Sequence, residues 1–518
     1  MERKRTMAIG YVVSAVAAAV ILFIGIECFF VPVNLTSKAF WILMLTALIP
    51  MGAVDFLLAT TGDDNSELPV KITAFGYTGL FIIFLVLLIA GSPLFHAKKY
   101  AGTIGDIESA DFAGTVSENV DLSKIALMDT ATAKSVGSRQ LGSLDKTISS
   151  QLEVGDYVQQ VVNGQPVKVA PLDYTGLMSY LHNKETGTFG YVVVNASDLS
   201  AKVVKVDGGI KYTSSAAFDH KVDRVVRNAF PTTIFGRKSF ELDESGHPFW
   251  IFQTGVNQTI LGNWKVTGVV TVDAVTGSVT RYGVSDIPVW VDTVFDGDYI
   301  TDKYNAYGRY AGGFWNGSLF GSRSGCTQTT LFISKGKDSK GNETTSKATD
   351  FGYVVDANDV WIFTGITSMN NSDNSDLGML MANERTGEVK YFAVPGADEQ
   401  SAMEAAEGEL QQYGYGASFP TLINVSGEPV YIMVMTDNSR IIKSYAVVSM
   451  QDRSHLSVGK TAEEALSKFG GSLSAVGTDE KTSVTTPSDA ETVTSFKVEN
   501  GTIYLTLSDG TVKIFQMK

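Results

Sequence analysis

The chain has 518 residues, with 41 Lys and Arg against 55 Asp and Glu, which gives a formal net charge of −14. Apolar residues make up 44% and charged residues 19%, which excludes global disorder, because disordered chains combine low hydrophobicity with high net charge. The length exceeds that of a single small domain. Two cysteines exclude a disulfide scaffold. The acidic balance argues against a nucleic-acid partner, which would require clustered Lys and Arg.

The first 96 residues carry three apolar stretches, 7–31, 39–59 and 72–90, separated by polar loops. Each is long enough for a helix of about 20 residues, the length that crosses a hydrocarbon core about 30 Å thick. A cleaved signal peptide is the alternative for the first stretch, but its apolar run is long and continues to Pro32. We therefore predict a membrane domain of residues 1–96 with three transmembrane helices in contact with the lipid bilayer.

Basic residues decide the predicted orientation. Arg3, Lys4 and Arg5 precede the first stretch, and basic flanks favour the cytoplasmic side of a membrane. The N-terminus is then cytoplasmic, and three crossings make the large C-terminal body extracytoplasmic. Lys98 and Lys99 follow the last stretch and run against this rule. We expect a protein of the cell membrane with its body outside the cytoplasm.

Two carboxylates, Glu27 and Asp55, fall within the apolar stretches. Ionisable groups in a membrane span are costly and often functional. Both stand close to a predicted helix end, so we expect their side chains to reach the membrane interface. A proton or ion path is the alternative interpretation.

The rest of the chain has the pattern of antiparallel sheet with a few helices. Apolar and polar residues alternate in short runs joined by Asn-Gly or Asp-Gly turns, which is typical of hairpins. We predict the α+β class, with N-terminal transmembrane helices followed by a large antiparallel-sheet-rich body. The segments with a helical pattern lie near residues 131–152, 217–229, 399–413 and 461–469.

An internal repeat is the most informative feature of the body. Two copies, starting at Gly190 and Gly378, share the order hairpin, helix, Phe-Pro, strand, Ser-Gly-x-Pro, strand. The Gly-x-Pro step stands at Gly246 and Gly427, and a third one stands at Gly164. Gly permits a positive φ at a turn, and Pro fixes φ where a strand begins. The recurrence therefore indicates a repeated fold unit and no particular chemistry.

The helix, the paired strands around Gly-x-Pro and the Asp-Ala-x-Thr-Gly hairpin of residues 273–277 resemble PepSY-type modules. Residues 383–387, Asn-Glu-Arg-Thr-Gly, form a related hairpin. The resemblance covers residues 190–282 and 376–450. It implies internally repeated PepSY-like modules, an extracytoplasmic location and regulation of a peptidase; the propeptide role does not carry over, because no protease follows the modules. The whole layout is similar to multi-pass envelope proteins of the Gram-positive type.

These features divide the chain into seven predicted parts. They are the membrane domain 1–96, the N-terminal part of the body 97–189, the first PepSY-like repeat 190–290, an aromatic and Gly-rich middle segment 291–375, the second PepSY-like repeat 376–470, a Ser/Thr-rich linker 471–495, and a C-terminal β-meander 496–518.

Aromatic residues beside amide and carboxylate groups distinguish the middle segment. Aromatic faces can stack on sugars or anchor a protein partner, and packing inside the body is the alternative use. We predict a binding surface for an envelope protein or a cell-wall ligand. The candidate binding residues are Trp290, Tyr299, Tyr304, Tyr307, Tyr310, Phe314 and Trp315.

Catalytic chemistry has little support in the sequence. Cys326 is the only cysteine of the body and follows a Gly-rich turn. A nucleophilic cysteine needs a nearby base, and His182, His220, His247 and His455 form no cysteine-hydrolase signature. We predict that the chain is not an enzyme and that Cys326 is a buried thiol. An envelope enzyme that uses Cys326 or acidic residues is the alternative.

No cofactor and no metal ion is predicted, because the histidines lack zinc spacing. Calcium is an alternative at two groups of oxygen-bearing side chains, although neither has the EF-hand spacing. These groups are Asn371, Asp373, Ser375 and Asp376, and Asp292, Asp296, Asp298 and Asp302.

Together these features predict a membrane-anchored extracytoplasmic protein of the bacterial cell envelope with a binding or regulatory role. It would modulate an envelope enzyme or bind a wall component. A structural subunit of a membrane assembly is a further alternative. The sequence leaves the oligomeric state open.

Overall fold

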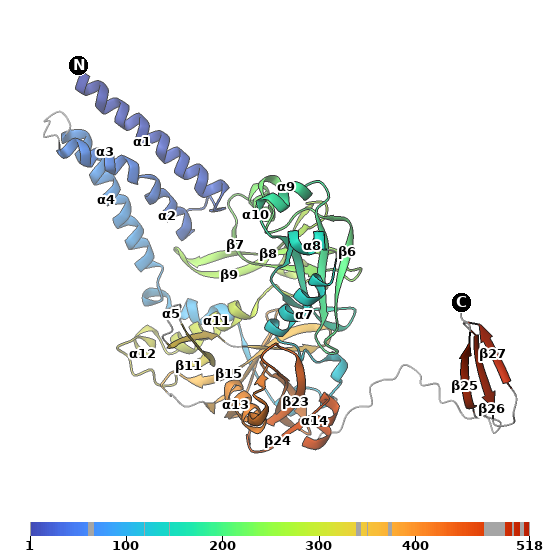
Figure 1. Cartoon of the computed structure of the whole chain (residues 1–518). Coiled ribbons are helices and arrows are strands. Elements are labelled where there is room, and N and C mark those ends of the chain that lie inside the picture. The colour runs from blue at the N-terminus through green and yellow to red at the C-terminus, as the bar shows by residue number, and fades with distance from the viewer. Residues whose placement is uncertain are drawn as a thin grey trace. The chain divides into compact units, whose positions relative to one another are not determined.

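The structure, a computed structural model, falls into two compact parts, Met1–Leu473 and Ser474–Lys518. The first part holds the N-terminal helices and a large body of helices and antiparallel sheets, and the second holds a small sheet (Figure 1). The predicted α+β class is confirmed. The residues that the structure describes are 2–60, 67–118, 120–144, 146–337, 343–349, 351–370, 375–470, 493–499, 502–507 and 512–516.

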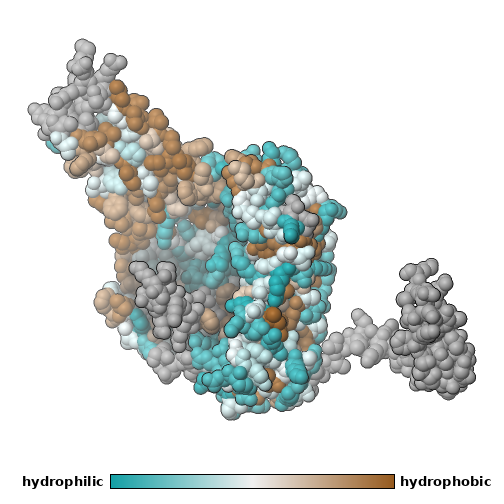
Figure 2. Space-filling model, in the orientation of Figure 1, coloured by the Kyte–Doolittle hydropathy of each residue, from teal (hydrophilic) through white to brown (hydrophobic). Residues whose placement is uncertain are grey.

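Helices precede the body: α1 (Glu2–Glu27), α2 (Lys38–Ala47), α3 (Ile49–Thr60) and α4 (Glu67–Ala90). Among the described residues, three helical stretches are long and apolar enough to cross a membrane: Ala8–Glu27, Lys38–Leu57 and Lys71–Ala90. They correspond to the three predicted spans, and α2 and α3 together make the second one. Apolar side chains gather over these helices in Figure 2, which is compatible with membrane anchoring.

The two carboxylates of the apolar stretches lie in different surroundings. Asp55 is 5% exposed, and its carboxylate accepts hydrogen bonds from the hydroxyls of Tyr11 (2.7 Å) and Thr73. It therefore turns inward between α1, α3 and α4. Glu27 is the last residue of α1, and its carbonyl oxygen accepts a hydrogen bond from Nη2 of Arg224 in the body (3.0 Å).

The described part of the body repeats one αβ unit four times. Each unit is a helix followed by four strands that pair in chain order. Unit 1 consists of α7 (Thr130–Gly142), β3 (Val158–Val162), β4 (Gln165–Tyr174), β5 (Thr188–Asn195) and β6 (Ala201–Ile210). Unit 2 consists of α10 (Val222–Ala229), β7 (Ile234–Leu242), β8 (Pro248–Thr259), β9 (Gly262–Asp273) and β10 (Val279–Gly283). Unit 3 consists of α11 (Gly297–Tyr310), β14 (Gly352–Asp356), β15 (Asp359–Ser368), β17 (Gly378–Asn383) and β18 (Val389–Phe392). Unit 4 consists of α13 (Glu399–Glu409), β21 (Thr421–Val425), β22 (Glu428–Thr436), β23 (Ile442–Ser449) and β24 (Leu456–Gly459).

All four units share two backbone features, a turn conformation and a hydrogen bond. A residue in the turn between the first two strands has a positive φ: Gly164 (74°), Gly246 (83°), Asn358 (66°) and Gly427 (87°). The amide that follows the third strand donates to a carbonyl at the start of the second strand. These pairs are Ala196 to Pro166, Ala274 to Pro248, Glu384 to Val360 and Met450 to Pro429, at 2.9, 3.1, 3.0 and 3.2 Å. The Gly-x-Pro steps of the sequence are the turns of units 1, 2 and 4.

The units pack in pairs, which we call the two halves of the body. Units 1 and 2 form the first half, in which their sheets enclose an apolar core with Val222 and Val226 of α10. Units 3 and 4 form the second half, whose core includes Ala402 and Ala406 of α13. Further apolar clusters cover the outer faces of the sheets: α7 covers unit 1, α11 covers unit 3, and α14 (Ala462–Phe469) covers unit 4.

Shorter helices and strands complete the body. A single parallel pairing in the described sheets joins β1 to β18, and the remaining pairings within them are antiparallel. The helices are α5 (Pro93–Ala101), α6 (Phe112–Thr115), α8 (Lys146–Gln151), α9 (Leu177–Asn183) and α12 (Phe314–Gly317). The strands are β1 (Ile107–Ala110), β2 (Leu152–Val154), β11 (Thr327–Thr329), β12 (Leu331–Lys337), β13 (Glu343–Thr349), β16 (Ser375–Asp376), β19 (Gly396–Ala397) and β20 (Gly416–Ala417).

The second part of the chain is a three-stranded antiparallel sheet, in the region where the sequence predicts a meander. Most of the predicted linker, residues 471–492, lies outside the described residues. The strands of this sheet are β25 (Val493–Glu499), β26 (Thr502–Leu507) and β27 (Val512–Gln516).

Candidate functional site

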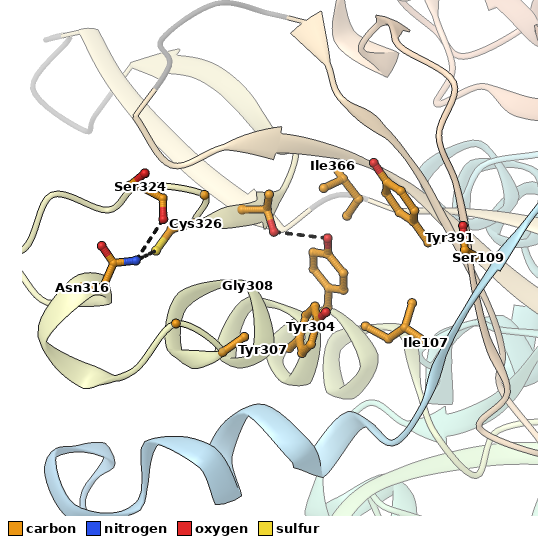
Figure 3. A pocket seen from close by; sticks show the side chains of 14 residues that line it. Ile107, Ser109, Tyr304, Tyr307, Gly308, Asn316, Ser324, Cys326, Ile366 and Tyr391 are labelled. Carbon is orange, nitrogen blue, oxygen red and sulfur yellow. Dashed lines mark hydrogen bonds between the residues drawn. The ribbon is translucent and has the colours of Figure 1, made fainter.

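An open cavity of about 410 Å³ lies beside α11, and 14 residues line it (Figure 3). We call it the tyrosine cavity, after Tyr304, Tyr307 and Tyr391. Its wall combines α11, the loop that ends at Cys326, and the strands β1, β15 and β18. Segments far apart in the chain therefore meet at this place.

The local fold of α11 explains how its tyrosines reach the cavity. Asp296 caps the helix by accepting a hydrogen bond from the amide of Tyr299 (3.0 Å). Tyr304 and Tyr307 are three residues apart and so share one face of the helix. On that face, a Cβ at Gly308 would lie 2.1 Å from the carbonyl oxygen of Thr327. Only glycine there lets β11 approach the helix closely enough to close the cavity.

The tyrosines present hydroxyl groups and one accessible ring. Tyr304 is 4% exposed, and its hydroxyl oxygen lies 3.3 Å from that of Thr327. Tyr307 is 37% exposed, which leaves part of its ring open to a ligand. The hydroxyl of Tyr391 donates to the carbonyl oxygen of Leu377 (3.3 Å). Burial raises the pKa of Tyr304 to about 12 and also raises the pKa of Tyr391, so both hydroxyls keep their protons at neutral pH.

Cys326 lines the cavity without a basic partner. The residue is 3% exposed, and its sulfur lies 3.5 Å from Nδ2 of Asn316 and 3.7 Å from the carbonyl oxygen of Arg309. Among the described lining residues there is no Asp, Glu, His, Lys or Arg. Neither group near the sulfur can take a proton from the thiol, as the alternative of a catalytic cysteine would require.

The cavity offers neutral hydrogen-bonding groups beside apolar and aromatic surface. Ser109, Asn316, Ser324 and Thr327 supply hydroxyl and amide groups, and Ile107 and Ile366 supply apolar walls. Such a wall matches a ligand that carries hydroxyls or amides and no charge.

Two of the seven predicted binding residues, Tyr304 and Tyr307, line the tyrosine cavity. Tyr310 lies on the opposite face of α11 and stacks on Phe314 with ring centroids 6.3 Å apart. Trp315 follows in α12 and is 70% exposed. These three do not line the cavity.

The remaining two predicted residues pack against the sheet of unit 2. Trp290 lies against Phe249, with ring centroids 4.7 Å apart. Tyr299 meets Trp264 edge to face at 5.8 Å. Both therefore take the packing role that the sequence left open as the alternative.

The sequence does not indicate the residues that β1, β15 and β18 contribute. Ser109 reaches the cavity because β1 pairs in parallel with β18, which places Ser109 opposite Tyr391. This pairing joins residues almost three hundred positions apart, so no local pattern could reveal it. The part of the cavity wall that does have a local sequence pattern is the loop ending at Cys326, which the Gly-rich turn before this residue indicates.

The second of the two groups named as an alternative calcium site does not assemble. Asp292 accepts a hydrogen bond from the amide of Val161 (2.7 Å), Asp298 pairs with Arg237 (2.5 Å), and Asp302 pairs with Lys303 (3.0 Å). Asp296 serves as the cap of α11. Asn371 and Asp373 of the other group lie outside the described residues. Within the described ranges, no group of three or more His, Cys, Asp or Glu could hold a metal ion.

Comparison with known proteins gives no family. No family model and no curated protein matches the chain. Among solved structures, an ACO/RPE65 chimera aligns at 10% identity with a TM-score of 0.18, over 63% of this chain and 65% of its own. The polysaccharide lyase Uly1 aligns at 9% identity with a TM-score of 0.16, over 71% of this chain and 78% of its own. Likenesses this weak carry no argument for fold or activity.

Proposed function

We propose that the chain is a membrane-anchored binding protein of the bacterial cell envelope, and that its tyrosine cavity takes an uncharged, hydroxyl- and amide-bearing ligand such as an N-acetylated wall sugar. The observation that carries this proposal is the lining of the cavity. It combines the partly exposed ring of Tyr307 with neutral hydroxyl and amide groups. Aromatic rings stack on sugar faces, while hydroxyls and amides pair with those of the ligand.

Binding accounts for this lining better than catalysis does. Group transfer and hydrolysis rely on a positioned acid, base or activated nucleophile. The described lining residues supply none, because Cys326 has only an amide and a carbonyl oxygen beside its sulfur. The chain would regulate an envelope enzyme if the ligand bound in the tyrosine cavity were a segment of that enzyme.

The proposed location combines several features of the chain. The three apolar helical stretches support an anchor in the lipid bilayer. Arg3, Lys4 and Arg5 favour a cytoplasmic N-terminus and an extracytoplasmic body. We also propose that the αβ units are PepSY-like, which the Gly-x-Pro turns and the hairpin of residues 273–277 support.

Isothermal titration of the full chain in a neutral detergent with an N-acetylglucosamine trimer tests the binding role. We expect Tyr307→Ala to weaken binding about 10-fold, because loss of one stacked ring costs about 1.4 kcal/mol. Tyr413→Ala is the matched control, since Tyr413 is exposed and does not line the cavity. Equal affinities of the two variants, or no heat with the wild-type chain, would contradict the proposed ligand.

Labelling of intact cells tests the location. Cys28 and Cys326 are replaced by Ala, and Lys184→Cys provides a thiol at an exposed turn of unit 1. We expect a membrane-impermeant maleimide to label intact cells as fully as permeabilised ones. Labelling only after permeabilisation would place the body in the cytoplasm and remove the wall ligand from consideration.

A further inference from the structure

A second cavity, of about 420 Å³, lies on the opposite face of α11 from the tyrosine cavity. We call it the basic cavity, after Lys38, Lys303 and Arg309. Lys38 is the first residue of α2, and Pro93, which also lines the cavity, begins α5 shortly after α4 ends. The cavity therefore lies where the apolar helices meet the body, at the level of lipid headgroups if those helices span a membrane.

Hydrogen bonds fix this arrangement of body and helices. The carbonyl oxygen of Gly91, directly after α4, accepts from the hydroxyls of Tyr100 (3.0 Å) and Thr259 (2.8 Å). The side-chain amide of Asn257 donates to the carbonyl oxygen of Thr36, which precedes α2 (2.7 Å). The distance of the basic cavity from the two helix ends is thus set by contacts from β8.

The cavity is positive in a chain whose net charge is −14. Lys303 is 8% exposed, with Nζ 3.0 Å from the carboxylate of Asp302 and 5.2 Å from the ring centre of Tyr299. Lys38 and Arg309 are exposed, and neither forms an ion pair within the described part of the chain. Asp302 balances one of the three cations, so two positive charges face the cavity without a partner.

Exposed apolar side chains stand on α5, which contributes Pro93 to the basic cavity, and in and after α12. Phe95 of α5 is exposed, as are Trp315, Leu319 and Phe320 in and after α12, and α12 contacts α5. Phe320 is the most open of them, at 91% exposure. Trp and Tyr gather at the headgroup level of membrane proteins, where one side of the ring is apolar and the other wet, and Trp315 is a residue of this kind. Exposed apolar surface on α5 and α12 favours a lipid over a free phosphate ion as the occupant.

We propose that the basic cavity binds the phosphate headgroup of an anionic membrane lipid. Lys38 and Arg309 make the two cationic contacts, with the planar guanidinium of Arg309 suited to two phosphate oxygens. The side chains of Phe95, Trp315 and Phe320 then rest against the same leaflet. This inference goes beyond the proposed function and needs only the membrane anchor, not the ligand of the tyrosine cavity.

Native mass spectrometry of the full chain in a neutral detergent tests the site, with phosphatidylglycerol, phosphatidylcholine and inorganic phosphate as separate probes. We expect one phosphatidylglycerol per chain to bind at least 10-fold more tightly than phosphatidylcholine. Lys38→Gln combined with Arg309→Gln should weaken phosphatidylglycerol binding about 30-fold, which corresponds to about 2 kcal/mol at about 1 kcal/mol per basic residue.

The matched control combines Lys184→Gln with Arg453→Gln, which removes the same charge from exposed positions that do not line the cavity. Its lipid affinity should equal that of the wild-type chain, and all variants should keep the wild-type melting temperature. Equal lipid affinities of the two double variants would overturn the proposal. Displacement of phosphatidylglycerol by inorganic phosphate at a similar concentration would overturn the choice of a lipid.

Discussion

The two halves of the body share one architecture but bury different groups. The register of their hairpins makes Phe240 equivalent to Leu422 and Trp250 equivalent to Tyr431, and all four lie in the apolar cores. The helices differ at their first residue, which is Val222 in α10 and Glu399 in α13, although both side chains are fully buried. The repeated fold therefore depends on turns and apolar pairs, whereas a buried carboxylate is an addition that only the second half carries at this position.

The second half places another acid beside Glu399. Oε1 of Glu399 accepts from the amide of Gly365 (2.8 Å), and Oε2 accepts from the hydroxyl of Thr330 (3.1 Å). The carboxylate of Asp376 is 1% exposed and has no hydrogen-bond partner among the described residues. Burial and the neighbouring acids Glu399 and Asp398 raise the pKa of Asp376 to about 10, and burial raises the pKa of Glu399 to about 7. Ionising this pair opposes folding.

The largest expected effects test whether the two cores are equivalent. Phe240→Ala should cost about 3–5 kcal/mol and Leu422→Ala about 2–5 kcal/mol, because each leaves a cavity between two packed sheets. Thermal unfolding in detergent, followed by circular dichroism, measures both. If the halves unfold separately, each variant lowers a different one of two transitions.

Leu319→Ala is the control for these core variants, since Leu319 is exposed and its truncation should change stability by less than about 0.5 kcal/mol. A Phe240→Ala variant as stable as this control would contradict the core assigned to the first half.

The sequence predicts much of this fold because its signals are local. In the hairpin of residues 273–277, Oδ1 of Asp273 accepts the amides of Val275 and Thr276 (2.8 and 3.0 Å), so the turn is encoded within five residues. Helices also lie at each of the segments with a helical pattern. The sequence pattern does not indicate the helix α11, because its glycines and spaced tyrosines conceal the apolar stripe formed by Ile300 and Tyr304.

Long-range pairing accounts for what the sequence could not show. Each predicted repeat copy begins at the third strand of one unit and runs through the next unit. The sequence does not reveal the boundaries of the units, because unit 3 lacks the Gly-x-Pro step and has Asn358 and Val360 in its place. Both cavities also combine α11 with segments from elsewhere in the chain, such as β1 and the start of α2. Their positions follow from the packing of whole units and not from any motif.

Removal of one buried acid sharpens the comparison of the halves. A pKa raised on folding stabilises the protein at low pH, and this stabilisation is lost as pH rises through the folded values of about 7 and about 10. We expect Asp376→Asn to gain stability over the wild-type chain as pH rises from 5 to 9, by up to about 1.4 kcal/mol per pH unit, because the unfolded carboxyl is ionised in this range while a folded pKa of about 10 keeps the folded carboxyl protonated. The difference should shrink toward pH 5.

Melting temperatures from pH 5 to pH 9 measure this effect. Glu241, Asp292 and Glu384 also have raised pKa values, so they too lower the stability of the protein as pH rises. This contribution is the same in the wild-type chain and in Asp376→Asn, and it cancels when the two are compared. Asp106→Asn removes an exposed acid that is in no ion pair among the described residues, and it should leave the wild-type profile unchanged. Parallel profiles for wild type and Asp376→Asn would show that the buried acid does not set the difference between the halves.

The smallest expected effects concern the shared turn. Ala357 precedes Asn358 and has a φ of 49°, a conformation that costs an L-residue about 1 kcal/mol, and Ser426 (56°) holds the same place before Gly427 in unit 4. Ala357→Gly should therefore stabilise the chain by about 0.5 kcal/mol after the entropy of glycine is counted. Gly427→Ala should destabilise it by about 1 kcal/mol, and this cost comes from φ alone, because the nearest atom to the added Cβ would be 3.7 Å away.

A helical glycine separates the cost of φ from the cost of adding a methyl group. Gly408→Ala, near the end of α13, places a Cβ in open space without a positive φ and should stabilise the chain by about 0.5–1 kcal/mol. Opposite signs for Gly408→Ala and Gly427→Ala in the same melting experiment would show that φ decides the effect. A positive φ at this turn is then the requirement that all four units share, and unit 3 meets it with Asn358 where the other three units have glycine, at a small cost in stability.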